Sequence, residues 1–287
     1  MMITLTTNEI ILLVSYLGIL YSSIMIDLVT MGIVGIGRVV GVKKKKFKRF
    51  YTPVSVIIPA YSEEKNIYNV IKSAARQTYP AKEIIVIEDN SPDNTYEECL
   101  RAKKDFDNVT VIRQTKNRGK AYNISYVMEN YDLGELVIVL DADTFLSKNY
   151  LQKITPCFNN KRIVIATGTS LPIKQKGFWA NLLFHGSMFT YSFFLFRKQA
   201  QSYRNAVSVV TGDSAVYRTA YLKKIGGLPQ RTQTEDMDVT WMALEDGYRI
   251  HYQRDALARS LDASTIKGAW KQIVRWFSGG FQGVFVH

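Results

Sequence analysis

Five short apolar runs, rich in β-branched residues, constrain the fold of this chain more than any other feature of its sequence. They are Val54–Ile58, Glu83–Ile87, Val109–Ile112, Leu136–Leu140 and Ile163–Ala166. Each run is continuously apolar rather than alternating, which is typical of strands buried on both faces of a parallel sheet. We therefore expect an α/β domain built on such a sheet.

The segments between these runs have helical character. Glu63–Gln77 and Gly119–Asn130 carry apolar residues at helical spacing, and Ser91-Pro92 predicts a helix start that leads to about Lys104. Alternating strands and helices predict a wound sheet that binds ligands at the carboxyl ends of its strands. The polar residues expected there are Tyr61, Glu63, Asp89, Asp141 and Asp143.

Composition excludes several classes of protein. At 287 residues and 47% hydrophobic content the chain can bury a substantial core, and 18 Gly with 7 Pro is too few for a collagen-like or disordered chain. Two cysteines, Cys99 and Cys157, cannot form a disulfide framework, and with three histidines they do not form a zinc cluster. We expect free thiols that face a reducing compartment.

An uncharged N-terminal stretch, Ile10–Ile26, predicts a membrane anchor within residues 1–42. As a helix it would span roughly 25 Å, close to the thickness of a hydrocarbon core. Asp27 either ends the span or faces a partner in a helix that continues to about Val34. No Lys or Arg precedes Arg38, which argues against a cleaved signal peptide.

A basic linker follows the anchor at residues 43–52. It contributes Lys43–Lys46, Lys48 and Arg49 to a net charge of +12. Because an apolar stretch precedes it, anionic membrane lipids are favoured as its partner over nucleic acid. The positive-inside rule then places the linker and the following domain on the cytoplasmic side of the plasma membrane.

A second long uncharged segment, Phe178–Phe196, is rich in aromatic residues. Its length would allow a membrane span, but polar residues such as Asn181 and His185 favour a helix that lies in the interface or beside the site.

The sequence Asp141-Ala142-Asp143 directly follows the fourth apolar run. Two carboxylates at this spacing can bind one hard divalent cation together with a phosphorylated ligand. The alternative is a solvated acidic turn. Asp89 follows the second run, where its carboxylate could accept the N–H of a uracil ring, whereas Asp93 is expected to cap the next helix.

Two motifs occur later in the chain. Thr234-Glu235-Asp236 precedes an expected helix at Met237–Asp246 and offers either a general base or acids that interact with the helix N-terminus. Helical spacing places Gln272, Arg275 and Trp276 on one face, suited to a diphosphate and a sugar ring. The alternative is an interfacial helix of basic and aromatic residues.

The order of these motifs resembles that of family-2 inverting glycosyltransferases of GT-A fold, a Rossmann-like domain, here residues 53–276. The matching segments are PAYSE at Pro59–Glu63, EDNSPD, NRGKA at Asn117–Ala121, DAD, TED and QIVRW. The last element and the anchor resemble the membrane-bound synthases of cellulose, chitin, hyaluronan and poly-N-acetylglucosamine.

The resemblance implies a role for each matching residue. Tyr61, Glu63 and Asp89 would contact the nucleoside, and Lys120 would lie on the nucleotide side of the cleft. Asp141 would contact the nucleotide-sugar, Asp143 would bind Mg²⁺ or Mn²⁺, and Glu235 would contact the substrate. Asp236 would be the catalytic base, and the diphosphate and acceptor sugar would be held by Gln272, Arg275 and Trp276. Val210–Ser214 falls where the family has an acceptor-side loop.

These roles predict an inverting transfer from a nucleotide-sugar, a UDP-sugar in the first instance, to a glycan or lipid-linked acceptor with formation of a β-linkage. Processive synthases continue beyond Q-x-x-R-W into several membrane helices, and residues 277–287 are interpreted as the start of an interfacial or membrane segment. Because the sequence ends at His287, eleven residues after Trp276, it leaves open whether the transfer is processive. The alternatives are transfer of a single sugar to a lipid-linked acceptor and a membrane-tethered nucleotide-binding protein without turnover.

Overall fold

The computed structural model describes residues 50–204 and 207–287, together with positions 25, 28, 29, 32, 36, 47 and 48. The stretch Ile10–Ile26 on which the expected anchor rests lies outside these residues apart from position 25, and so do Lys43–Lys46 and Arg49 of the basic linker. Within the described part of the chain, no helix is both long enough and apolar enough to cross a membrane.

The first half of the domain winds as the sequence predicts. Its elements are β1 (Val54–Ala60), α2 (Ile67–Ala75), β2 (Glu83–Glu88), α3 (Thr95–Asp105), β3 (Val109–Arg113), α4 (Lys120–Asn130) and β4 (Leu136–Val139). β1 lies between β2 and β4 and pairs with both in parallel, and β2 pairs in parallel with β3. The chain order therefore reverses between β1 and β4, which is where wound sheets commonly bind ligands.

The second half contains β6 (Ile163–Pro172), which the fifth apolar run predicts, and three further strands that no apolar run predicts: β5 (Thr144–Leu146), β7 (Val216–Arg218) and β8 (Arg249–Ser260). Its helical elements are α5 (Tyr150–Ile154), a 3₁₀ turn (Thr155–Asn159), α6 (Phe178–Arg204), α7 (Thr219–Lys224), α8 (Glu235–Glu245) and α9 (Ile266–Val286). Over the residues described, the strand order is β3-β2-β1-β4-β7-β6-β8-β5. The sheet is mixed, because β7 runs antiparallel to β4 and β6, and β5 runs antiparallel to β8.

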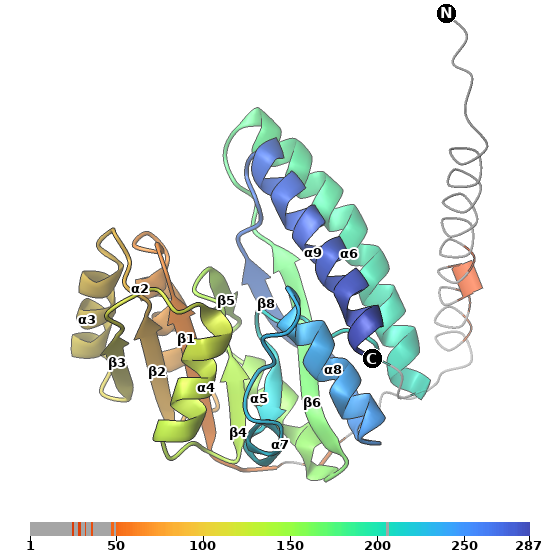
Figure 1. The fold of residues 1–287 in the computed structure, drawn as a ribbon, viewed down its shortest axis with the longest axis horizontal. Coiled ribbons are helices and arrows are strands. Elements are labelled where there is room, and N and C mark those ends of the chain that lie inside the picture. Colours follow the sequence, from red (N-terminus) through yellow and green to blue (C-terminus); the bar gives the residue numbers. More distant parts are fainter. Residues whose placement is uncertain are drawn as a thin grey trace, which may run out of the picture.

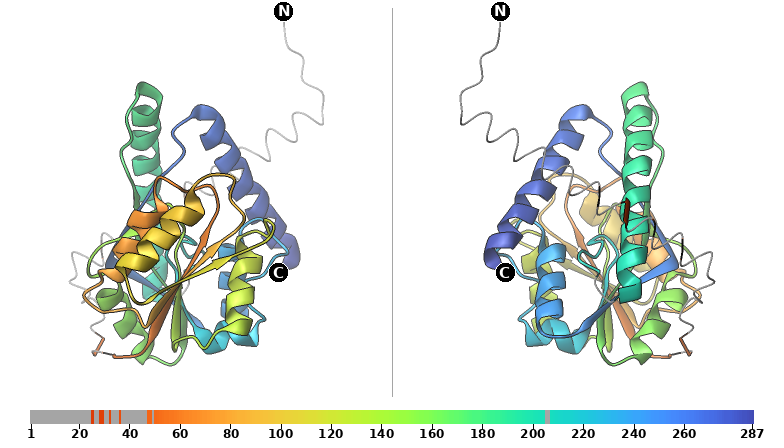
Figure 2. Two further views of the ribbon diagram at one scale, coloured as in Figure 1. Left: turned by 90° about the vertical axis from the view of Figure 1, so that its left-hand side faces the viewer. Right: turned by 90° about the vertical axis from the view of Figure 1, so that its right-hand side faces the viewer.

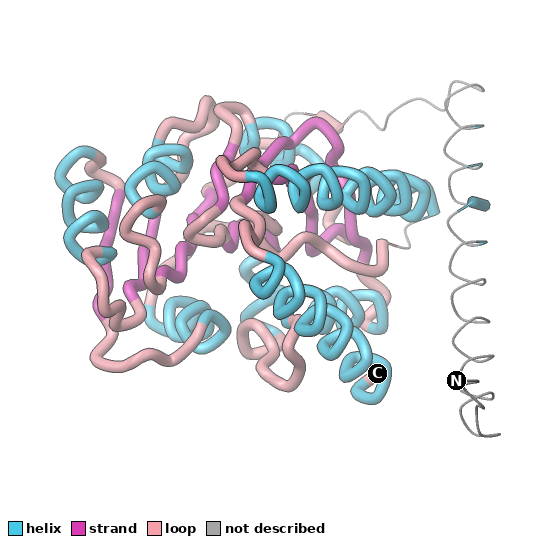
Figure 3. Tube along the Cα trace, turned by 90° about the horizontal axis from the view of Figure 1, so that it is seen from above, coloured by secondary structure: helices cyan, strands magenta, loops and turns pink. Residues whose placement is uncertain are grey.

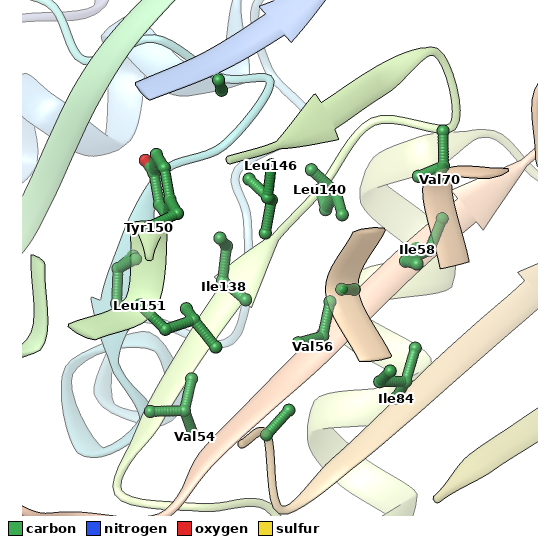
Figure 4. Close-up of a cluster of buried hydrophobic side chains, with 14 of the residues drawn as sticks. Val54, Val56, Ile58, Val70, Ile84, Ile138, Leu140, Leu146, Tyr150 and Leu151 are labelled. Carbon is green, nitrogen blue, oxygen red and sulfur yellow. The ribbon is translucent and has the colours of Figure 1, made fainter. Parts of the chain in front are cut away.

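Helices cover both faces of the sheet (Figures 1 and 2). Alternate residues of β1 point to opposite sides: Val56 and Ile58 pack with α2, α3 and α5, whereas Ile57 packs with α4, α7 and α8. Figure 4 shows the first of these clusters, in which Val70 of α2 and Tyr150 of α5 lie over the strands. Burial on both faces explains why the strand sequences are continuously apolar.

Three helix starts differ from the sequence prediction. α3 begins at Thr95 rather than at Pro92, because the Ser91 hydroxyl accepts the N–H of Ser62 and its own N–H donates to Glu88. Ser91 is thus held in a loop rather than at a helix cap. α2 begins at Ile67 instead of Glu63. α8 begins at Glu235, so Asp236 lies in the first helical turn and not in the loop before it.

Two long helices, α6 and α9, extend alongside the sheet on its α8 side and splay apart (Figures 1–3). α6 continues to Arg204, beyond the predicted end at Phe196. Both carry exposed apolar side chains, including Phe178, Trp179, Leu182, Phe189 and Phe194 on α6, and Trp270, Phe277, Phe281 and Phe285 on α9.

Candidate active site

The site is built where the carboxyl ends of β1, β2 and β4 meet the start of β7. Because β7 is antiparallel to β4, the residues before β7 lie beside those after β4. The N–H of Asp141 donates to the carbonyl of Asp213 at 3.0 Å, and the N–H of Val139 donates to that of Ala215 at 3.1 Å. The loop before β7 therefore lies directly beside the D-x-D segment.

Carboxylates gather around Asp143. Burial raises the pKa of Asp143 to about 7, and repulsion from Asp141, Glu63 and Asp213 adds to the effect. The pKa values of Glu63 and Asp213 are also raised, in each case first by burial. These side chains repel one another, so this edge of the sheet favours a cation.

A divalent cation fits the chemistry of this edge. Mg²⁺ and Mn²⁺ prefer oxygen ligands, and Mg²⁺ commonly binds through one or two carboxylates together with water and substrate phosphates. Among the residues that the structure describes, no group of three or more His, Cys, Asp and Glu side chains could hold a metal ion. Asp143 is suited to such a shared site because its environment already disfavours an unpaired negative charge.

Lys120 joins the two acidic motifs. Its Nζ lies 2.7 Å from Asp141 Oδ1 and 3.0 Å from Glu235 Oε1, and it donates to the carbonyl of Gly212 at 3.1 Å. Burial lowers the pKa of Lys120, but attraction to the two carboxylates outweighs this, and the pKa is raised above its ordinary value. One ammonium group thus holds D-x-D, the TED segment and the loop before β7 together, and contact of Lys120 with the nucleotide stays a prediction.

Asp236 is fixed by two backbone donors. Its Oδ1 accepts the N–H of Met237 at 2.9 Å, and its Oδ2 accepts the N–H of Gly212 at 3.1 Å. Burial raises the pKa of Asp236 to about 6, with a further contribution from Glu235, while Lys120 opposes the shift. A half-buried carboxylate with this pKa is suited to act as a general base near neutral pH.

The neighbouring Glu235 has the opposite shift. Burial would raise its pKa, but attraction to Lys120 and to Arg275 gives a pKa below the ordinary value. Two adjacent carboxyl groups are therefore pushed apart in pKa, a pattern that commonly accompanies distinct roles. Glu235 remains ionised, whereas Asp236 titrates closer to neutrality.

Helix α9 packs against α8 through two glycines. A Cβ at Gly279 would lie 2.5 Å from the Thr234 side chain, and one at Gly283 would lie 3.2 Å from the Trp241 ring. This close contact brings the Q-x-x-R-W segment near the TED segment, where Arg275 is exposed yet close enough to affect Glu235. Gln272 and Trp276 are half-buried in the same segment.

The residues predicted to contact the nucleoside are placed as follows. Asp89 is buried, and its two carboxylate oxygens accept the N–H groups of Arg118 and Gly119 at 2.8 Å. It therefore holds the turn before α4, and its contact with a uracil stays a prediction. Tyr61 is 48% exposed after the end of β1. Asp93 accepts the N–H of Thr95 at 3.2 Å, but the N-cap position of α3 belongs to Asn94, so Asp93 lies one residue before the predicted cap.

Two site residues were not singled out by the motifs. Asp213 accepts hydrogen bonds from the hydroxyls of Ser170 and Ser214. Lys198 of α6 reaches the same loop, where its Nζ donates to Thr211 Oγ1 at 2.5 Å. The sequence signal for Asp213 was its place in the expected acceptor-side loop, and the signal for Lys198 was a charge that follows a long uncharged run.

Known proteins share this arrangement of elements at the level of sequence and fold. Residues 55–226 match the model of the family described as Glycosyl transferase family 2. The poly-beta-1,6-N-acetyl-D-glucosamine synthase of Staphylococcus epidermidis is 31% identical over 231 residues, which cover 80% of this chain and 55% of that protein. A Staphylococcus aureus (strain COL) protein of the same name is 29% identical over 232 residues. The chain thus spans about half the length of these curated relatives.

Two solved structures show the same fold. The mannosyltransferase PcManGT from Pyrobaculum calidifontis, in complex with GDP-Man and Mn²⁺, has a TM-score of 0.67 at 18% identity and covers 91% of this chain and 73% of its own. S. aureus TarS 1–349, in complex with UDP-GlcNAc, has a TM-score of 0.54 at 20% identity and covers 74% and 59%. With more than half of its residues matched by the family model, this chain belongs to glycosyl transferase family 2.

Proposed function

We propose that this protein is a membrane-bound inverting glycosyltransferase that uses a UDP-sugar and extends a glycan or lipid-linked acceptor at the cytoplasmic face of the plasma membrane. The observation that carries the proposal is the bridge of Lys120 between Asp141 and Glu235, next to Asp236. This bridge brings the acidic D-x-D segment, which is expected to face the nucleotide-sugar, and the candidate base into one site. The similarity to poly-beta-1,6-N-acetyl-D-glucosamine synthases supports UDP-GlcNAc as the first donor to test.

The reaction needs one base and a stabilised leaving group. Asp236 accepts the proton of the acceptor hydroxyl, whose oxygen attacks C1 of the sugar from the face opposite the diphosphate. The bond between C1 and the diphosphate oxygen breaks, and UDP leaves with the electron pair. Attack from the opposite face converts an α-linked donor into a β-linked product.

The other residues prepare this step. Arg275 lies near the TED segment and supplies positive charge for the departing diphosphate. Glu235 and Asp141 keep Lys120 in place. A bound Mg²⁺ or Mn²⁺, held by Asp143, would supply further charge neutralisation for the diphosphate. Stabilising developing charge in this way is commonly a large part of catalysis.

Membrane attachment is part of the proposal. Exposed aromatic residues on α6 and α9, such as Trp179, Trp270 and Phe277, would lie at the lipid interface. The lysine-rich linker would bind anionic headgroups, and the N-terminal stretch would anchor the chain. Flotation with anionic and neutral vesicles, compared at low and high salt, measures these contributions separately.

The decisive experiment incubates membranes that contain the protein with a panel of labelled nucleotide-sugars and sizes the product. Transfer from UDP-GlcNAc to a long product indicates a polymerase, and a single added sugar indicates the non-processive alternative. Asp236→Asn should abolish transfer and retain UDP binding. Asp132→Asn, a change at a fully exposed acid, is the matched control. UDP binding without turnover of any donor would contradict the proposal.

A further inference from the structure

Lys198 links the long helix α6 to the loop before β7. Its Nζ donates to Thr211 Oγ1 at 2.5 Å. Thr211 is held on its other side by Thr167 of β6, whose hydroxyl donates to Thr211 Oγ1 at 3.1 Å and accepts the Thr211 N–H at 3.0 Å. The side chain of Lys198 is thus tied to a fixed point of the sheet.

The next residue along this loop contacts the candidate base. Gly212 donates its N–H to Asp236 Oδ2 at 3.1 Å, and its carbonyl accepts a hydrogen bond from Lys120. A Cβ at position 212 would lie 2.9 Å from the same Oδ2. Small displacements of Thr211 would therefore reach the Asp236 carboxylate directly.

Lys198 also bears on the charge around the base. The titratable groups that face Asp236 are Glu235 from its own helix, Lys120 from α4, Lys198 from α6 and the buried Tyr217 from β7. Lys198 itself faces Asp213 and Asp236. Burial lowers the pKa of Lys198 to about 8, so its ammonium group remains mostly charged at neutral pH.

We propose that Lys198 is a positioning residue for the base Asp236: it holds the Thr211–Gly212 segment against Oδ2, and its positive charge offsets Glu235 and Asp213 so that Asp236 is ionised when the acceptor hydroxyl arrives. This inference rests on the proposed function. It adds a residue of α6, a helix that carries exposed aromatic side chains, to the residues that prepare Asp236 to accept the proton of the acceptor hydroxyl.

The charge and the hydrogen bond can be separated by substitution. Lys198→Gln keeps a donor for Thr211 and loses the charge, whereas Lys198→Arg keeps both. Removing one nearby positive charge should move the acidic limb of the kcat/KM profile upward by about one pH unit. The arginine variant should stay close to the unaltered protein.

The experiment measures kcat/KM for the acceptor as a function of pH, with the nucleotide-sugar at saturation and the full-length protein in membranes. It compares the unaltered chain with the two variants. Lys223→Gln, which removes an exposed charge at the end of α7, is the matched control and should leave the profile in place. Thr211→Val keeps the Lys198 charge and removes the hydroxyl, so it should lower kcat several-fold without moving the acidic limb. Thermal unfolding of each variant accompanies the kinetics, and Thr211→Val tests the positioning role if Lys198→Gln does not fold.

The inference is overturned by an acidic limb that does not move in Lys198→Gln, by equal losses at every pH, or by unchanged kcat in Thr211→Val. A pH profile of Lys198→Arg that differs from that of the unaltered protein would assign Lys198 to substrate contact instead. Absence of transfer by the unaltered protein removes the proposed function and the inference with it. Transfer with an unmoved limb removes the inference alone.

Discussion

The N–H of Gly212 lies 3.1 Å from Oδ2 of Asp236, and the same oxygen occupies the space where a side chain at position 212 would begin. The candidate base is therefore positioned by a residue without a side chain, from a loop that precedes it by more than twenty positions.

Gly212→Ala should displace the Asp236 carboxylate. Because the new Cβ would lie 2.9 Å from Oδ2, we expect kcat to fall by about tenfold to a hundredfold while UDP binding persists. Single-turnover transfer and UDP titration distinguish the two effects. Gly186→Ala, in open space on α6, is the control and should retain activity. Full activity in Gly212→Ala would show that this contact does not position the base.

Lys120→Met should remove the bridge between the motifs. It leaves Asp141 and Glu235 without their shared cation, and we expect the free energy of unfolding to fall by about 1–3 kcal/mol. This is less than the loss expected for a fully buried ion pair, because the Lys120 side chain is 29% exposed. Urea unfolding at neutral pH measures the change. Lys82→Met breaks the more exposed pair with Asp132 and should cost less than about 1 kcal/mol. Equal losses in the two variants would contradict a special role for the bridge.

Asp143 should make the metal-free protein sensitive to pH. Its folded-state pKa is raised to about 7 from 3.8, so the neutral form is favoured in the folded state. The contribution of the Asp143 carboxyl group to the free energy of unfolding is therefore fully present below pH 3.8 and is lost as pH rises through about 7. Asp143→Asn lacks this penalty, and in EDTA we expect it to gain on the order of 1 kcal/mol, or about 2–4 °C in Tm, at about pH 8.

The same gain should be absent at about pH 4, where the carboxyl group is neutral in the folded protein. Asp132→Asn, at a fully exposed acid, should show little difference at either pH. A Tm difference for Asp143→Asn that does not change with pH would rule out the electrostatic explanation.

Metal removal should stop transfer while the protein stays folded. We expect EDTA to abolish activity and Mg²⁺ or Mn²⁺ to restore it, because hard cations bind oxygen ligands reversibly and share the substrate phosphates. Asp143→Asn should weaken metal-supported UDP binding more than Asp141→Asn, since Asp141 is already paired with Lys120. Equal responses of the two variants, or full activity in EDTA, would refute the assignment.

Sequence predicts well those elements of the fold that depend on the residues of a single short segment. The runs at β1, β2 and β4 are almost continuously apolar because both of their faces are buried, and the acids that follow β2 and β4 could be placed at one edge of the sheet. Family resemblance supplied the roles of the motifs. Helix starts were less accurate because Ser91 bonds to a loop 29 positions away instead of capping a helix.

The contacts that assemble the site were not predictable from local sequence. Asp213 lies beside Asp141 because β7, which is three residues long, pairs antiparallel with β4. So short a strand leaves no periodic signal. Lys198 meets Thr211 because α6 packs against β6 and β8, and the charge after its long uncharged run does not indicate this partner.

The contact of Gly279 with Thr234 restricts how this chain can be recombined with its relatives. No side chain fits between α9 and the start of α8, so the segment that carries Arg275 and the segment that carries Asp236 share one interlocked surface. A chimera that takes α9 from one parent and α8 from another would have to match at that surface. Crossovers that keep residues 234–283 from a single parent should therefore give more folded protein than crossovers within them.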